Sequence, residues 1–306
     1  MMQHLRFFLA SVACLWFAGT AAADDIPMID AHSQIELDVD IDFVIAQMDK
    51  AGVARTILST RGRFPPNVLA TYARRFPDRI TAAVRTKGNI FTNNSPKFRK
   101  FFNAQVSMPE YTAMAEVILW HAKKGHMAPE QITSINTPQA QMALRTAVER
   151  GWPFIFHYEF AAAGDARGTI VAEMEETLRA HPDHPFALIH MGQLDAAAAA
   201  RLLAAHGNLH FMVSHANPIA SAVSGQPWTE MFDGDSLSKE WREVIENHPD
   251  RFVLNFDNVF PDHWGNFYLK QAALWQGVLN QLPPEIGHAI GHGNAERLWK
   301  LPKVGS

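Results

Sequence analysis

Cysteine is almost absent from this sequence. Its one cysteine, Cys14, lies in an N-terminal segment that we expect to be removed. The mature chain should therefore have no disulfide, no thiolate metal ligand and no cysteine nucleophile. Any metal site must then be built from histidine, carboxylate and amide side chains. The lack of thiols also suits an oxidising compartment such as the periplasm.

Basic charge is not in excess either. The 306 residues carry a formal net charge of −4, and no basic run is longer than a pair such as those at 99–100 and 123–124. This balance argues against a nucleic-acid-binding surface. With 47% hydrophobic and 19% charged residues, the composition is that of an ordinary globular protein. We expect a small-molecule substrate as the partner, and a homo-oligomer remains open.

The sequence has one long apolar run, "FFLASVACLWFAG" at residues 7–19. It is too short to favour a membrane-spanning helix. His4 and Arg6 precede it, and Ala21 and Ala23 satisfy the small-x-small cleavage rule. Residues 1–23 are therefore predicted to be a cleaved signal peptide, with 24–306 as one exported, periplasmic domain. A lipid anchor on Cys14 is the less favoured alternative.

Beyond the leader, short apolar segments of strand character alternate with amphipathic helical segments. The helical segments include residues 42–52, 138–151, 169–181 and 195–207. The expected strands are residues 27–32, 53–59, 80–85, 115–121, 153–157, 186–190, 209–214 and 252–257. They are β-branched or aromatic and nearly all apolar, as strands buried on both faces are. Eight such repeats predict an α/β fold of the (β/α)8 TIM-barrel type, with a doubly wound open sheet as the alternative.

Polar residues gather where these strands end, which in a barrel is the catalytic face. In chain order they are His32, Gln34, Arg61, Lys87, His121, His157, His190, Ser214, His215 and Asp257. A histidine after an apolar strand is most often a hydrogen-bonded rim residue. Imidazoles and a carboxylate at four separate strand ends are instead typical of a site for a zinc-like ion.

Two segments are candidates for loops over this face. Residues 86–114 form the longest irregular stretch in the sequence, and loops of that length are commonly functional lids. Residues 215–236, after the seventh strand, form the second candidate. The end of the fourth strand offers His121, Lys123, Lys124 and His126 but no clear ligand position.

Several short motifs resemble the amidohydrolase superfamily, specifically its amidohydrolase-2 branch. "MIDAHSQ" is similar to that family's first-strand Asp-x-His-x-His, "FHYEF" to its fifth-strand histidine, and "LIHMGQ" to its sixth-strand His-Met-Gly. "NFDNVFPDHWG" resembles the eighth-strand aspartate region, and "IGHGNAERLWKL" the closing Gly-Asn-Ala-x-Arg-Leu segment. The resemblance implies a metal-dependent hydrolase or non-oxidative decarboxylase of a small carboxylate, ester, lactone or amide.

Carried over to this chain, the resemblance implies His32, His157 and Asp257 as ligands of a Zn or Mn ion. Asp257 would also be the general base, and His190 would bind the substrate oxygen and the attacking water. From their side-chain chemistry, Arg61, Lys87, Lys124 and His215 are the candidates for holding a substrate carboxylate or its neighbours.

Gln34 departs from the family pattern, since it stands where the second histidine is expected. An amide oxygen binds hard cations but is a poor zinc ligand. Two hypotheses follow: a metal enzyme in which Gln34 assists the other ligands, or a metal-free barrel that binds a ligand or works by acid–base groups alone.

Overall fold

The computed structural model describes residues 25–125 and 128–304. The predicted strands are all present in it. They are β1 (Met28–Ile35), β2 (Val53–Thr60), β3 (Ile80–Thr86), β4 (Tyr111–His121), β6 (Phe154–Tyr158), β7 (Phe186–Leu188), β8 (Leu209–Met212) and β11 (Phe252–Val253). Three short strands lie outside this series: β5 (Gln131–Ile132), which pairs with β4, and the hairpin of β9 (Phe232–Asp233) and β10 (Ser236–Leu237).

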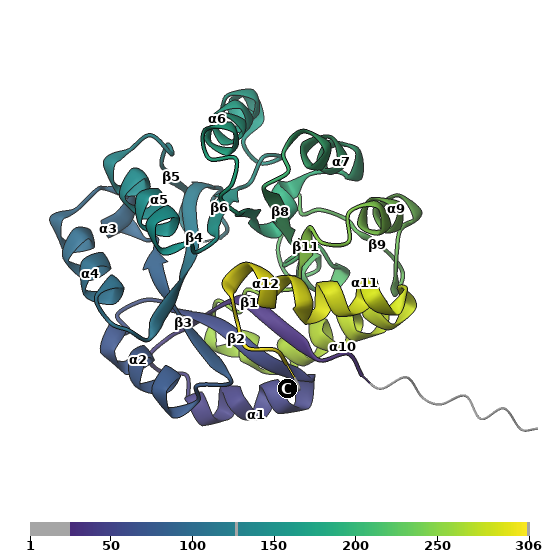
Figure 1. Cartoon of the computed structure of the whole chain (residues 1–306), viewed down its shortest axis with the longest axis horizontal. Helices are drawn as coiled ribbons and strands as arrows, with labels where there is room; N and C mark the ends of the chain where they lie inside the picture. The colour runs from purple at the N-terminus through teal and green to yellow at the C-terminus, as the bar shows by residue number, and fades with distance from the viewer. Residues whose placement is uncertain (1–24, 126–127, 305–306) are drawn as a thin grey trace, which may run out of the picture.

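The eight strands pair in parallel in the order β1-β2-β3-β4-β6-β7-β8-β11. Backbone hydrogen bonds then join β1 to the segment that follows β11. The Ala31 amide donates to Leu254 O at 3.0 Å, and the Asp257 amide to His32 O at 2.9 Å. The sheet is thereby curled into a nearly closed barrel, which confirms the TIM-barrel prediction (Figure 1).

Helices connect the strands and surround the barrel (Figure 1). They are α1 (Ile41–Ala51), α2 (Pro66–Arg75), α3 (Asn89–Thr92), α4 (Pro96–Val106), α5 (Pro138–Arg150), α6 (Arg167–Ala180), α7 (Ala196–Ala205), α8 (Pro218–Ser221), α9 (Lys239–Asn247), α10 (Asn266–Gln281), α11 (Pro284–His288) and α12 (Asn294–Trp299). Their ends follow local chemistry. Asp40 caps the first turn of α1, and Gly52, at φ 68°, ends that helix in the left-handed region.

Two apolar layers hold the barrel together. The outer one lies between the strands and the surrounding helices, and the inner one fills the barrel itself. The inner layer consists largely of small or branched side chains, such as Ala83, Ala115 and Ile155. Helix α12 completes it from below, because Leu298 and Trp299 pack against these residues. The barrel is thus a filled core with α12 as its plug, and only its upper end is free for chemistry.

Two sequence expectations need correction. Residues 86–114 are not an irregular lid: they form α3, α4 and the start of β4. Pro96 begins α4, where Ser95 caps the first turn, and Phe98 and Phe102 bury its inner face. The regular strands β7, β8 and β11 also end earlier than predicted. His190, His215 and Asp257, which follow them, all have left-handed backbones, with φ between 51° and 61°.

No helix within residues 25–125 and 128–304 is long and apolar enough to cross a membrane. The predicted signal peptide, residues 1–23, lies outside the described residues, as does His126.

Candidate active site

A cavity of about 760 Å³ opens at the carboxyl ends of the strands. It collects nearly all the side chains singled out from the sequence: Gln34, Arg61, Lys87, Lys124, His157, His190, His215 and Asp257. His32 is fully buried and joins the cluster through contacts with Asp257 and with Glu116 of β4. The segment after β8 contributes Val223, Ser224 and Trp228, so the prediction that residues 215–236 reach this face is confirmed.

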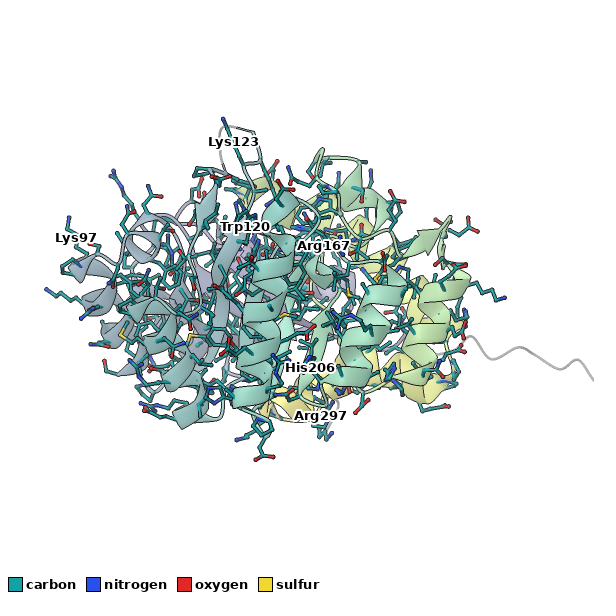
Figure 2. All side chains as sticks on the ribbon, turned by 90° about the horizontal axis from the view of Figure 1, so that it is seen from above. Lys97, Trp120, Lys123, Arg167, His206 and Arg297 are labelled. Atoms are coloured by element: carbon teal, nitrogen blue, oxygen red, sulfur yellow. The ribbon has the colours of Figure 1, made fainter. Side chains whose placement is uncertain are left out.

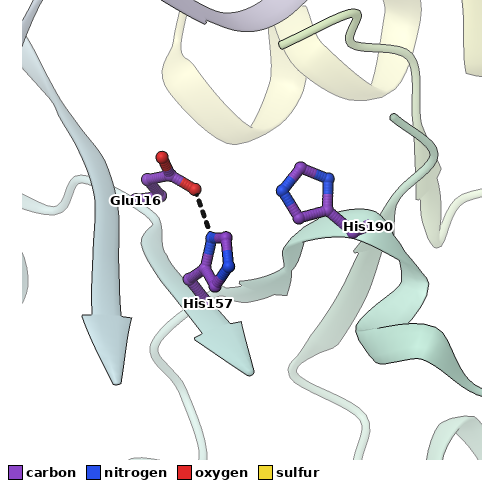
Figure 3. Close-up of side chains that lie close together, drawn as sticks. All are labelled: Glu116, His157 and His190. Atoms are coloured by element: carbon purple, nitrogen blue, oxygen red, sulfur yellow. Dashed lines mark hydrogen bonds and ion pairs between the residues drawn. The ribbon is translucent and has the colours of Figure 1, made fainter. Parts of the chain in front are cut away.

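The carboxylate of Glu116 is at the centre of the site. Its Oε2 lies 2.6 Å from Nδ1 of His157 (Figure 3). Its Oε1 accepts a hydrogen bond from Lys87 Nζ at 2.5 Å. Burial alone would raise the pKa of Glu116, but the charges of Lys87 and His157 hold it well below its usual value. Glu116 is therefore an ionised carboxylate, although its side chain is almost completely buried.

His157 lies between two carboxylates. Its Nδ1 faces Glu116, and its Nε2 is 3.1 Å from Oε1 of Glu159. Burial would lower the pKa of His157, but the two carboxylates raise it to about 9. Glu159 is completely buried and also accepts a hydrogen bond from the Ala122 amide at 2.8 Å. A carboxylate on one ring nitrogen is the arrangement that orients metal-ligating histidines.

His32 has no hydrogen-bond partner for either ring nitrogen among the described residues. Its Nε2 lies 3.6 Å from both Glu116 Oε1 and Asp257 Oδ1. Gln34 lies beside it and donates through Nε2 to Asp257 at 2.9 Å and to Glu116 at 3.3 Å, while its Oε1 is buried without a partner. Unpartnered buried polar atoms are costly, so the three on His32 and Gln34, two residues that contact both carboxylates, indicate a place for another group.

His190 faces Asp257 from the opposite side. Its Nε2 is 3.5 Å from Asp257 Oδ2, and its Nδ1 is 2.9 Å from Ser214 Oγ, which accepts a hydrogen bond from Asn255. Burial, reinforced by His215 and His157, lowers the pKa of His190 far below its ordinary value, so the ring is neutral. Left-handed backbone at a non-glycine residue costs roughly 1–2 kcal/mol. Such strain at His190, His215 and Asp257 together is typical of functional sites.

His215 and Trp228 form the wall of the cavity beside His190. The rings of His190 and His215 stack with centroids 4.3 Å apart, and Trp228 lies 4.6 Å from His215. Burial lowers the pKa of His215 to about 4, so it too is neutral. This wall is flat and partly apolar, and it suits a planar substrate group.

The comparisons with known proteins agree with this geometry. The family model described as "Amidohydrolase" matches residues 129–301, more than half of the chain. The chain belongs to the amidohydrolase family. This is a family of enzymes, so the expectation of an enzyme is also confirmed. Among curated proteins no match was found.

Solved structures share the fold of this amidohydrolase. One is a probable 2-pyrone-4,6-dicarboxylic acid hydrolase from Acinetobacter baumannii (12% identity, 90% of this chain and 99% of that one, TM-score 0.53). Another is 2,6-dihydroxybenzoate decarboxylase from Rhizobium (14% identity, 90% of this chain and 98% of that one, TM-score 0.52). A third is 5-carboxyvanillate decarboxylase from Sphingomonas paucimobilis (11% identity, 90% of this chain and 100% of that one, TM-score 0.55).

The cations of the amidohydrolase cavity differ in how far they are neutralised. Lys87 pairs with Glu116, Lys124 with Glu159, and Arg61 with Glu36. Arg85 also lines the cavity and has no ion pair with any described residue; its guanidinium donates to Gly62 O at 2.8 Å. The three predicted substrate-binding cations are thus in the cavity, but Arg85, which the sequence analysis did not select, is the less neutralised group.

Sequence reasoning also missed Glu116 and Glu159 in this amidohydrolase. Strand β4 runs on beyond the level of His157, which is opposite Ile118, so Glu116 lies inside the strand rather than at its end. A signal was present, since Glu116 is the one acidic residue in the apolar run "YTAMAEVILWH". His121, from the end of β4, also lines the cavity. It lies 3.0 Å from Lys124 Nζ, and its ring nitrogen is within 4.8 Å of the donor atoms of His157 and Glu159.

Proposed function

We propose that this amidohydrolase is a metal-dependent hydrolase or non-oxidative decarboxylase of a small carboxylate, ester, lactone or amide. The observation that carries the proposal is His32, a fully buried imidazole with two unpartnered nitrogens beside two buried carboxylates. Clusters of His32, Glu116 and Asp257, and of Glu116, His157 and His190, each bring their donor atoms within 4.8 Å.

The donor set fits a divalent ion. His32, Glu116, His157 and Asp257 would hold it, and the unpartnered Oε1 of Gln34 supplies a further oxygen if the amide turns toward it. Two carboxylates with imidazoles suit Mn²⁺ or Zn²⁺. When bound, such an ion lowers the pKa of a bound water and polarises a substrate oxygen.

The remaining chemistry belongs to the chain itself. Asp257 has one oxygen fixed by Gln34 and the other facing His190, so it is placed to take a proton from the attacking water. Neutral His190, held by Ser214, is placed to donate to an oxygen that gains negative charge. Glu159 keeps His157 in one orientation.

The cavity favours a small anionic substrate with a planar part. Arg61, Arg85, Lys87 and Lys124 supply positive charge, and Trp228, Phe260 and Phe267 supply aromatic surface. The names of the structural neighbours, two decarboxylases and a dicarboxylic acid hydrolase, support this class of substrate without identifying the compound.

A metal-free acid–base enzyme or binding protein is the second candidate, and Gln34 favours it. Its amide nitrogen bridges Glu116 and Asp257, while Lys87 and His157 neutralise Glu116. Because these hydrogen bonds and positive charges already stabilise the two carboxylates, a metal ion is less necessary to neutralise them.

Activity measurements on a panel of substrates test the proposal. The chelator-treated protein and protein reloaded with Mn²⁺ or Zn²⁺ are assayed on 2-pyrone-4,6-dicarboxylate, 2,6-dihydroxybenzoate and 5-carboxyvanillate, and on simple lactones and amides. Turnover that depends on metal and is lost in Asp257→Asn supports it. Metal-independent turnover that survives in Asp257→Asn would support the second candidate instead.

Export to the periplasm and the oligomeric state stay predictions. Alkaline phosphatase fused after residue 23 reports export, and light scattering of the mature chain reports its assembly.

A further inference from the structure

Two histidines lie one helical turn apart on the face opposite the active-site mouth. His288 is the last residue of α11, and His292 lies in the π-helical turn Ala289–Gly293 that leads into α12. This segment packs beneath the barrel, because Asn294 Nδ2 donates to Phe252 O at the start of β11. Figure 2 shows Arg297 of α12 on the side of the molecule opposite to Lys123. Lys123 is next to Lys124, which lines the active-site cavity.

The ring nitrogens of the pair converge. His288 Nδ1 lies 3.2 Å from His292 Nε2, and the two rings are nearly perpendicular, with an interplanar angle of 86°. Two imidazole nitrogens on adjacent positions of a metal ion lie at a comparable separation, since each metal–nitrogen bond is about 2.0–2.1 Å. His288 is exposed and His292 is partly exposed, so an aqueous ion can reach both.

A buried carboxylate fixes the second histidine. Oε1 of Glu296 is 3.0 Å from His292 Nδ1, and Glu296 is only 3% exposed. The amide of Val304 donates to the same carboxylate at 2.7 Å, and Lys303 Nζ donates at 3.0 Å. His292 therefore keeps its proton on Nδ1 and presents the Nε2 lone pair toward His288. This is the carboxylate–histidine arrangement of established metal sites.

We propose that His288 and His292 form a peripheral binding site for a divalent transition-metal ion of the Cu²⁺, Ni²⁺ or Zn²⁺ class. Two neutral imidazole nitrogens replace two waters of the hydrated ion, and the remaining positions keep water. In the metal-free pair His288 donates from Nδ1 to His292, so on binding the ion its proton moves to Nε2 and Nδ1 becomes the ligand. Two waters leave the ion, and neither the metal nor the protein changes its oxidation state. The ion joins α11 to the turn that leads into α12, and thereby stabilises the helix that plugs the barrel.

Copper binding tests this site independently of the enzymatic proposal. Untagged mature protein is freed of metal and titrated with Cu²⁺, with binding followed by calorimetry and by electron paramagnetic resonance. The matched variants are His288→Gln, at an exposed position, and His292→Gln. His248→Gln removes a histidine from outside the pair and is the control.

Wild type and His248→Gln should bind about one equivalent of Cu²⁺ more than either pair variant, since an imidazole pair is a strong copper ligand. The spectrum of that equivalent should show nitrogen couplings that disappear in His288→Gln, and Cu²⁺ should raise the unfolding temperature only when the pair is intact. Equal stoichiometry and spectra in wild type and both pair variants would overturn the proposal, and the pair would then be a hydrogen bond only. The test compares the number of Cu²⁺ ions bound by wild type and by the pair variants. Any ion bound in the active site is counted equally in all of them, so the result does not depend on whether the active site binds metal.

Discussion

Oε2 of Glu116 on β4 lies 2.6 Å from Nδ1 of His157 on β6, and this contact joins the two halves of the site (Figure 3). On one side it continues to Lys87 and Gln34, and on the other to Glu159 and Lys124. Each of the two carboxylates holds one nitrogen of the same imidazole. A change at Glu116 should therefore alter the orientation of His157 as well as the charge of the centre.

Glu116→Gln should abolish tight metal binding, because it removes the carboxylate that contacts both His32 and His157. Loss of an outer partner typically costs about 10- to 100-fold in metal affinity, so loss of a direct ligand should cost at least roughly 100-fold. Competition with a fluorescent chelator measures the affinity. Glu149→Gln, on the exposed end of α5, is the matched control. Equal affinity in both variants would exclude Glu116 as a ligand.

Gln34→His should strengthen metal binding, because an imidazole is a better zinc ligand than an amide. We expect a gain of roughly tenfold in Zn²⁺ affinity, measured by the same competition. Gln226→His places an imidazole in the same cavity away from the carboxylates and should leave the affinity unchanged. A weaker site in Gln34→His would mean that the hydrogen bonds from Gln34 to the carboxylates matter more than its ligand type.

Ser214→Ala should lower kcat roughly tenfold while KM changes little, because His190 loses the hydroxyl that orients it. It should also cost about 1–3 kcal/mol of stability, since Asn255 Nδ2 loses its buried partner. Steady-state kinetics and urea unfolding measure the two effects. Ser214→Thr keeps the hydroxyl and should retain most of the activity. Equal kcat in all three proteins would show that the Ser214 hydroxyl does not position His190 for the rate-limiting step.

The stability of the protein should fall between pH 8 and pH 5, in part through His210. Burial lowers the pKa of His210 from 6.5 to about 4. As the pH falls below 6.5, the unfolded chain takes up a proton that the folded chain does not take, so unfolding is favoured. For this one group the loss is about 2 kcal/mol at pH 5.

Urea unfolding of wild type and His210→Gln at both pH values measures that contribution. The variant should lose about 2 kcal/mol less than wild type over this range, since the other histidines contribute equally to both proteins. The same pH dependence in the two proteins would contradict the prediction.

The fold was predictable because its strands are mostly apolar and alternate with helices that carry their own start and stop signals. The segments at 42–52 and 138–151 both end at a glycine, and each glycine ends its helix in the left-handed region. The irregular structure expected at 86–114 was wrong, although residues 87–89 of this segment do line the cavity. The segment "PKFRKFF" begins α4, which continues to Val106, but the basic residues between its buried positions Phe98 and Phe102 obscured the helical pattern.

Most of the site was predictable as well, because barrel strands bring their ends together whatever lies between them. Glu116 was missed, since sequence alone does not show that β4 extends past the level of the other strands. Arg85 was missed for a different reason. Arg61 and Lys124 are neutralised by Glu36 and Glu159, which are far from them in the sequence. The sequence alone therefore does not show which cation in the cavity lacks an acidic partner.

The most direct test of the central claim is elemental analysis of the mature protein, exported to the periplasm and purified without chelator. It is best made in the His288→Gln variant, so that the peripheral pair does not contribute. We predict near-stoichiometric manganese or zinc, which falls sharply when Glu116→Gln is added. No metal in the purified protein, and none retained after incubation with Mn²⁺ or Zn²⁺, would contradict the claim. Gln34 would then mark a barrel that works without an ion.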